Sequence, residues 1–264
     1  MDRIELQHLT IGYREKAGEK VVLSDLNAAI NAGELTCLIG PNGVGKSTLL
    51  RTLSAFQPPL SGRVVMALDG REPVDLQSLK SAERSQLIGV VLTERPDVQN
   101  MTVRELVSLG RSPYTDFWGR CTESDYAVVD GALSQVGIGH LSRRNVSTLR
   151  DGARQKVMIA KALAQETPVV FLDEPTAFLD FPSKVEVMKL LRSISRTTGK
   201  TIFLSTHDVE MALQLADTLW LLGSGRGISI GSPRQLAADG TLSAYFDGPG
   251  IVFDADHVRL TVKP

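Results

Sequence analysis

The sequence predicts an α/β fold in which a largely parallel sheet is wrapped by helices. Residues 35–39, 169–172 and 201–204 form short, nearly continuous apolar runs, as expected for strands buried on both faces. Helical patterns separate these runs, and strands that alternate with helices produce a parallel sheet. The chain through Ala32 has strand patterns only, which predicts an antiparallel β portion, and residues 95–150 predict an inserted α-helical subdomain.

The first third of the chain alternates strands, a loop and a helix. The pattern at 4–6 and the apolar run that starts at Val21 predict two strands, and residues 35–39 predict the first buried strand. A Gly-rich loop follows, and the leucines within 49–53 have helical spacing. After a turn, residues 63–66 predict another strand.

The remainder begins with a core strand at 90–92 and then changes to helical spacing from about Thr102 to Ser147. An amphipathic helix at 185–191 separates the two later strands. From Gly231 onward the chain is punctuated by glycine and proline and ends in a strand-like segment at 258–262. We therefore expect one domain over 1–264, with residues 232–264 as a C-terminal extension.

Composition and charge exclude several classes of protein. With 42% hydrophobic and 22% charged residues, the chain is neither disordered nor fibrous. Its net charge of −1 gives no reason to expect nucleic acid as a partner. We expect no disulfide between Cys37 and Cys121, because nothing indicates an oxidising compartment. The sequence shows no signal core and no apolar run near the ~18 residues that span a bilayer, so we expect a cytoplasmic protein.

A phosphate-binding motif follows the strand at 35–39 and precedes a helix, the context that distinguishes it from an accidental Gly-rich turn. Its residues are, in order, Gly40, Pro41, Asn42, Gly43, Val44, Gly45, Lys46 and Ser47. Glycines let backbone N–H groups converge on phosphates, and the helix N-terminus adds its dipole. Lys46 would reach the β- and γ-phosphates, Ser47 would bind Mg²⁺, and Thr48 would contact the α-phosphate. The sequence therefore predicts a P-loop NTPase core that binds ATP.

Two carboxylates follow the strand at 169–172. Asp173 and Glu174 stand at its carboxyl end, where open α/β sheets bind ligands. Asp173 is suited to contact Mg²⁺, and Glu174 is suited to act as a general base toward the attacking water. A solvated acidic pair is the alternative for such a dipeptide alone, but the phosphate motif in the same chain favours a catalytic pair.

Together these segments resemble the ATP-binding-cassette (ABC) family over most of the chain. Residues 173–176 followed by Leu179-Asp180 resemble its Walker B motif and D-loop, and residues 204–208 resemble its switch-histidine segment. The resemblance implies that Asp180 belongs to the nucleotide site and that His207 contacts the γ-phosphate. It also implies that Tyr13 stacks on adenine, although core packing remains an alternative for one aromatic residue in a short strand.

Within that family, residues 101–107 and 110–114 resemble the importers of iron–siderophore complexes, haem and cobalamin. The resemblance implies a homodimer with ATP and Mg²⁺ at its interface. It also implies two transmembrane permease subunits, a substrate-binding protein, and a peripheral place on the cytoplasmic face of the bacterial inner membrane. The cargo stays open among the three chelates.

The chain departs from the family pattern at two places. Where the family has Leu-Ser-Gly-Gly-Gln, residues 149–153 place Arg150 at the serine position and retain Gly152. Arg150 is long enough to clash with the nucleotide or to supply positive charge to its phosphates. Where the family has a glutamine that touches Mg²⁺, the chain has Thr93 and Glu94, of which Glu94 is a candidate metal ligand. A nucleotide-binding cassette with impaired hydrolysis is therefore the alternative function.

Two other classes fit less well. A small-molecule kinase shares the phosphate motif but does not require the acidic pair, Asp180 and His207 in this order. Cassette proteins of DNA repair or translation resemble long, interrupted or tandem chains, whereas this chain has one compact cassette and no basic patch. The sequence thus favours an ATPase that energises transport.

Overall fold

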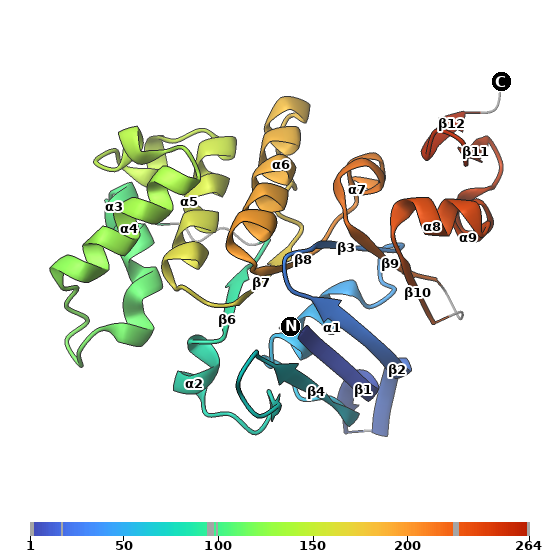
Figure 1. Ribbon diagram of the computed structural model, residues 1–264, viewed down its shortest axis with the longest axis horizontal. Helices are drawn as coiled ribbons and strands as arrows, with labels where there is room; N and C mark the ends of the chain where they lie inside the picture. The colour runs from blue at the N-terminus through green and yellow to red at the C-terminus, as the bar shows by residue number, and fades with distance from the viewer. Residues whose placement is uncertain (1–2, 17, 94–97, 99, 224–226, 263–264) are drawn as a thin grey trace. The chain divides into compact units, whose positions relative to one another are not determined.

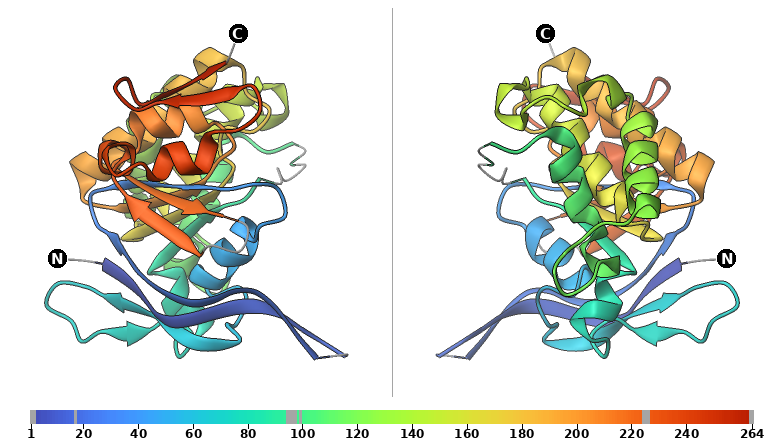
Figure 2. Two further views of the ribbon diagram at one scale, coloured as in Figure 1. Left: turned by 90° about the vertical axis from the view of Figure 1, so that its right-hand side faces the viewer. Right: turned by 90° about the vertical axis from the view of Figure 1, so that its left-hand side faces the viewer.

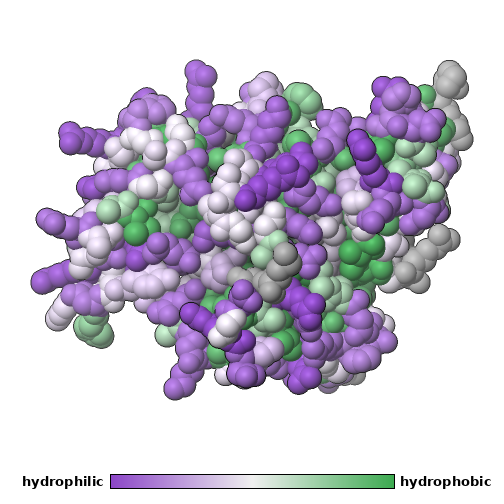
Figure 3. Space-filling view, in the orientation of Figure 1, coloured by the Kyte–Doolittle hydropathy of each residue, from purple (hydrophilic) through white to green (hydrophobic). Residues whose placement is uncertain are grey.

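The computed structural model describes residues 3–16, 18–93, 98, 100–223 and 227–262. The chain forms two compact units, one made of residues 1–78 and 191–264 and the other of residues 79–190. Figure 1 labels most of the helices and strands of both units. Among the described residues, no helix is long and apolar enough to cross a membrane. Hydrophilic residues predominate on the face drawn in Figure 3, with smaller hydrophobic areas between them.

The first unit contains the antiparallel sheet that the sequence predicted. Its strands are β1 (Arg3–Glu15), β2 (Gly18–Asn31), β4 (Ser61–Ala67) and β5 (Val74–Asp75), in the order β2-β1-β4-β5. Ile4 of the central strand β1 lies opposite Ile30 on one side and Met66 on the other, and all three are buried. This cross-strand apolar set holds the register, because a slip by one residue would turn it toward solvent.

The same unit contains a parallel set of strands. It consists of β3 (Leu35–Ile39), β8 (Thr201–Ser205), β9 (Thr218–Leu222) and the antiparallel edge strand β10 (Ile228–Gly231). Every residue of β3 and β8 is buried, as the continuous apolar runs predicted. The helix α1 (Lys46–Leu53) follows β3, and α7 (Val209–Leu215) follows β8.

The C-terminal segment is more regular than its glycines and prolines suggest (Figures 1 and 2, red). It contains α8 (Pro233–Ala238), α9 (Thr241–Phe246) and the hairpin β11 (Ile251–Asp254)–β12 (Arg259–Val262). The hairpin is tied to α7, because the Leu260 N–H donates to Glu210 Oε1 at 2.8 Å. The hydroxyl of Tyr245 in α9 donates to the Leu222 carbonyl at the end of β9, also at 2.8 Å.

The second unit combines two parallel strands with the inserted helices that the sequence predicted. The strands β6 (Ile88–Val91) and β7 (Val169–Asp173) pair in parallel, with Val91 opposite Leu172. The helices are α2 (Ser81–Ser85), α3 (Val103–Ser108), α4 (Glu123–Gln135), α5 (Asp151–Ala164) and the beginning of α6 (Phe181–Thr198). Three short 3₁₀ turns join them, at Leu109–Tyr114, Gly139–Leu141 and Val146–Thr148.

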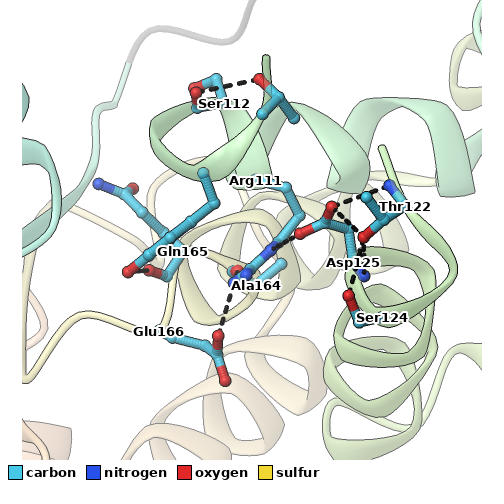
Figure 4. A network of polar contacts seen from close by, with 10 residues as sticks. Arg111, Ser112, Thr122, Ser124, Asp125, Ala164, Gln165 and Glu166 are labelled. Carbon is cyan, nitrogen blue, oxygen red and sulfur yellow. Dashed lines mark hydrogen bonds and ion pairs between the residues drawn. The ribbon is translucent and has the colours of Figure 1, made fainter. Parts of the chain in front are cut away.

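A buried arginine joins the helices of this unit (Figure 4). Arg111 donates to Asp125 at 3.0 Å, to the Ala164 carbonyl at 2.8 Å and to Glu166 at 2.7 Å. Hydrogen bonds from the backbone N–H and hydroxyl of Thr122, followed by that from Arg111, lower the pKa of Asp125 to about 2. The carboxylate is therefore charged at neutral pH, and the guanidinium links the turn at 109–114 to α4 and to the end of α5.

Candidate functional site

The phosphate loop between β3 and α1 depends on glycine at defined points. Gly45 has a φ of 111°, and a Cβ there would lie 2.4 Å from Val22 Cγ1. At Gly40, a Cβ would lie 2.8 Å from Val44 Cγ1 and 3.0 Å from Leu222 Cβ. Both positions therefore require the absence of a side chain, the first also because of its left-handed backbone. The result is a tight loop that ends at the N-terminus of α1.

The residues of the loop differ in how far they are exposed to solvent. Lys46 is buried, and its ammonium group donates to the Gly40 carbonyl at 2.7 Å and to the Pro41 carbonyl at 3.1 Å. The charge is thus held inside the curve of the loop. Thr48 is also buried, whereas Val44 and Gly45 are partly buried. The exposed residues of the motif are Pro41, Asn42, Gly43 and Ser47.

Tyr13 lies beside this loop. Its hydroxyl is 2.7 Å from Thr48 Oγ1, which joins the end of β1 to the first turn of α1. The residue is 39% exposed, so part of it remains open to solvent. An aromatic ring that is held next to a phosphate loop and open to solvent is suited to stacking on a planar base.

His207 stands at the same edge of the parallel strands as the loop. Leu38 of β3 pairs with Ser205 of β8. Gly40 comes two residues after Leu38, and His207 comes two residues after Ser205. The Thr206 N–H also donates to the Leu38 carbonyl at 3.1 Å, which continues the contact past the end of β8. The side chain of His207 is exposed at this edge. Strand register therefore places the loop and the histidine side by side within the first unit.

The acidic pair belongs to the second unit. Asp173 is the last residue of β7, and both it and Glu174 are partly buried. Glu174 has a φ of 48°, which is uncommon for a residue other than glycine. The Ala177 N–H donates to the Glu174 carbonyl at 3.0 Å, so a tight turn follows the pair. Strained backbone of this kind is concentrated at functional sites.

Asp180 and Gly152 both contact the first turn of α6. Asp180 accepts a hydrogen bond from the Ser183 N–H at 3.0 Å, and the bonds from Ser183 hold the pKa of Asp180 below its usual value. A Cβ on Gly152 would lie 2.9 Å from Ser183 Oγ. The glycine therefore lets the start of α5 pack closely against the start of α6.

Arg150 occupies the N-cap position of α5, is exposed and makes no side-chain cap hydrogen bond. An arginine here is unfavourable for two reasons. Its side chain accepts no hydrogen bonds from the free N–H groups of the first turn, and its positive charge is repelled by the positive end of the helix dipole.

We expect Arg150→Ser to stabilise the protein by about 1 kcal/mol, since serine caps these N–H groups. In thermal denaturation the midpoint should rise by about 2–4 °C. Arg150→Ala is the control, because it removes the charge without adding a cap. If alanine raised the midpoint as much as serine, the missing cap would not be the cause.

The structure thus assembles the predicted residues in two groups. Tyr13, residues 40–48 and His207 lie together in the first unit. The second unit contains Arg150, Gly152, Asp173, Glu174 and Asp180. Glu94 lies outside the described residues. Within the described ranges, no three His, Cys, Asp or Glu side chains gather into a metal-binding cluster.

The chain is similar to several known proteins. Residues 23–177 match the family model described as ABC transporter. The chain is 39% identical to an uncharacterised ABC transporter ATP-binding protein of Methanocaldococcus jannaschii, over 92% of this chain and 81% of the relative. It is 37% identical to the ferric enterobactin transport ATP-binding protein of Escherichia coli K12, over 89% of this chain and 83% of that protein.

Two further likenesses extend the comparison. The cobalamin import ATP-binding protein of Halobacterium salinarum is 37% identical over 88% of this chain, which spans 56% of that longer relative. Among solved structures, the fold is similar to that of a transporter described as of the metal-chelate ABC type, in an inward-facing conformation. The TM-score is 0.77 at 26% identity, and the match covers 93% of this chain and 89% of that one.

Proposed function

Because the chain belongs to the ABC transporter family, we propose that it is the ATP-hydrolysing subunit of an importer for a metal chelate. The observation that carries the ATPase activity is the phosphate loop, with the Lys46 ammonium group held inside its curve and Tyr13 beside it. The relatives named for ferric enterobactin and cobalamin support a chelate as cargo. Ferric siderophore, haem and cobalamin are the three candidates.

Nucleotide binding is assigned to the first unit. The carbonyls of Gly40 and Pro41 already hold the ammonium group of Lys46, which can exchange these partners for β- and γ-phosphate oxygens. Backbone N–H groups of the loop and of the first turn of α1 supply further donors. The Thr48 hydroxyl contacts the α-phosphate, and the neighbouring Tyr13 ring stacks on adenine.

The residues present also fit Mg²⁺. This ion takes oxygen ligands and keeps several waters, so it needs only one or two protein groups together with phosphate oxygens. The exposed hydroxyl of Ser47 and the carboxylate of Asp173 are the proposed ligands, and Glu94 is a further candidate. When bound, Mg²⁺ supplies charge that neutralises the phosphate oxygens.

Hydrolysis then requires positioning more than covalent chemistry. Glu174 accepts a proton from the attacking water while the water oxygen bonds to the γ-phosphorus. The bond from that phosphorus to the bridging oxygen breaks, ADP leaves, and the proton passes from Glu174 to solvent or phosphate. His207 contacts the γ-phosphate and helps to orient the water, and the Lys46 charge stabilises the developing negative charge.

The wider assembly is a homodimer with ATP at its interface. Arg150, Gly152 and Asp180 of one copy would face the nucleotide held by the other copy. The inserted helices within 95–150 are proposed to contact two transmembrane permease subunits, which receive cargo from a substrate-binding protein. The complex would lie on the cytoplasmic face of a bacterial inner membrane, with residues 232–264 as a C-terminal extension of the single domain over 1–264.

Uptake by cells tests the transport function. In the source organism, the chromosomal copy is replaced by a Lys46→Ala copy, and uptake of radiolabelled ferric siderophore, haem and cobalamin is measured. Loss of the lysine removes the positive charge that would contact the β- and γ-phosphates, so we expect uptake of one chelate to fall to background. Lys189→Ala is the matched control, because Lys189 is an exposed lysine on α6 and lies outside the nucleotide site.

If uptake of one chelate is lost in Lys46→Ala and is normal in Lys189→Ala, the result would support the proposal and identify the cargo. Unchanged uptake of all three chelates, with the variant expressed at the normal level, would overturn chelate import. Whether the purified chain hydrolyses ATP is a separate measurement, so failure of the cargo assignment would be distinguished from failure of the ATPase assignment.

A further inference from the structure

A threonine hydroxyl contacts the backbone between the two carboxylates of the acidic pair. Because β6 and β7 pair with Val91 opposite Leu172, the residues just beyond these strands lie next to each other. Thr93 Oγ1 donates to the Asp173 carbonyl at 2.8 Å. Thr93 is partly buried, so its hydrogen bond is sheltered from competing water.

The carbonyl that Thr93 contacts belongs to the peptide group that joins Asp173 to Glu174. A peptide group is planar, so the direction of its carbonyl fixes the plane from which the Glu174 backbone departs. Rotation from that plane is the φ of Glu174, whose value of 48° lies in the sparsely populated left-handed region. A residue in this region stays there only when its surroundings hold it. Thr93 holds the peptide on the N-terminal side, and the Ala177 N–H holds the Glu174 carbonyl on the other.

We propose that Thr93 is a positioning residue for ATP hydrolysis. Its hydroxyl fixes the Asp173–Glu174 peptide group and thereby aims the Glu174 carboxylate at the attacking water. The inference rests on the proposed function, because it takes Glu174 as the general base. The general base must lie within hydrogen-bond reach of the water, so a small rotation of this peptide lowers the rate without weakening nucleotide binding.

The same bond joins two segments of the proposed active site. Thr93 lies just beyond β6, whereas Asp173 is eighty positions further along the chain. One hydroxyl therefore anchors the residue just beyond β6 to the strand end that carries Asp173 and Glu174. A side chain without a hydroxyl would remove this bond, which extends the contact beyond the strand pairing at Val91 and Leu172.

The other end of β7 provides a matched control. Thr167 Oγ1 donates to the Val169 carbonyl at 2.9 Å, and this threonine is fully buried. This bond is also from a threonine hydroxyl to a carbonyl of β7, within its own segment, and it lies at the opposite end of the strand from Asp173. Thr167→Val therefore removes a comparable bond from β7 without touching the Asp173–Glu174 peptide. Loss of strand stability alone would affect both variants, whereas loss of Glu174 positioning would affect only Thr93→Val.

The experiment compares steady-state hydrolysis and ATP affinity for the full chain with its Thr93→Val, Thr93→Ser and Thr167→Val variants. We expect Thr93→Val to lower kcat by about tenfold with KM and Kd for MgATP within about twofold, because Glu174 acts only on the transition state. Thr93→Ser retains the hydroxyl and should stay within about twofold of the native kcat. Thr167→Val should leave kcat within about twofold while lowering the thermal midpoint.

A native kcat in Thr93→Val, or an equal fall of kcat in Thr167→Val, would overturn the positioning role. If Thr93→Val does not fold, Thr93→Ala replaces it, and failure of Thr93→Ser to keep the rate would likewise overturn the proposal. Glu174→Gln is measured in the same series. If that variant retained full turnover, both the general base and the positioning role would be wrong, whereas an inactive Glu174→Gln with a normal Thr93→Val would overturn the positioning role alone.

Discussion

Glu174→Gln is expected to lower kcat for ATP hydrolysis by at least about a hundredfold, while the protein still binds MgATP. The amide has nearly the shape of the carboxylate but does not accept the proton of the attacking water. The substitution also leaves the left-handed backbone at this position unchanged, because glutamine and glutamate have the same unbranched Cβ. The loss should therefore fall on kcat, with little change in the affinity for nucleotide.

Phosphate release under saturating MgATP measures this effect, and binding of a fluorescent ATP analogue measures affinity in parallel. Glu72→Gln is the matched control, because Glu72 is exposed and lies outside the candidate site. Hydrolysis by Glu174→Gln at the native rate would exclude Glu174 as the general base. A loss of binding together with turnover would instead indicate that the variant disrupts the site as a whole.

Arg111→Met is expected to lower the free energy of unfolding by about 3–5 kcal/mol, which is the cost of removing one partner of a buried ion pair while the other stays buried. The arginine side chain is only 7% exposed, and its three acceptors come from two segments of the chain that are far apart in sequence. Methionine fills similar space but leaves the Ala164 carbonyl and the sheltered carboxylate of Asp125 without this donor. Glu166 is 54% exposed and is rehydrated at little cost.

The same unit contains a natural control for this prediction. Arg104 binds Asp130 through two hydrogen bonds of 2.9 and 2.7 Å and stacks over Tyr126, as Arg111 stacks over Tyr114. Its side chain is 41% exposed, however, so Arg104→Met should cost no more than about 1 kcal/mol. Urea denaturation of both variants gives the comparison. Equal losses would show that burial does not set the strength of the Arg111 network.

Several parts of the fold could be predicted from the sequence because their signals are local. The strand at 35–39, the loop and α1 form one continuous pattern, and the required glycines stand within a few residues of the lysine that they help to position. The acidic pair likewise follows its own strand directly. Spacing within 102–147 predicted helices, and helices within that range are present.

The C-terminal segment was predicted less completely. Only the strand at 258–262 was expected, and β12 occupies 259–262, but α8 and α9 were missed. A local signal for α8 was available, since Ser232 and Gln235 form a capping box and Pro233 begins the helix. Proline and glycine in this segment mark the starts of short helices, Pro233 in α8 and the N-cap Gly240 before α9.

The sequence by itself determined the class of fold, the phosphate loop and the identity of the acidic pair, because each is written in consecutive residues. Only the tertiary structure decided which distant side chains act together. The Tyr13 hydroxyl meets Thr48 across 35 positions, Arg111 meets Ala164 across 53, and Thr93 meets Asp173 across 80. These contacts depend on strand register and on the packing of helices, and both arise from the whole buried core, so that no local pattern encodes them.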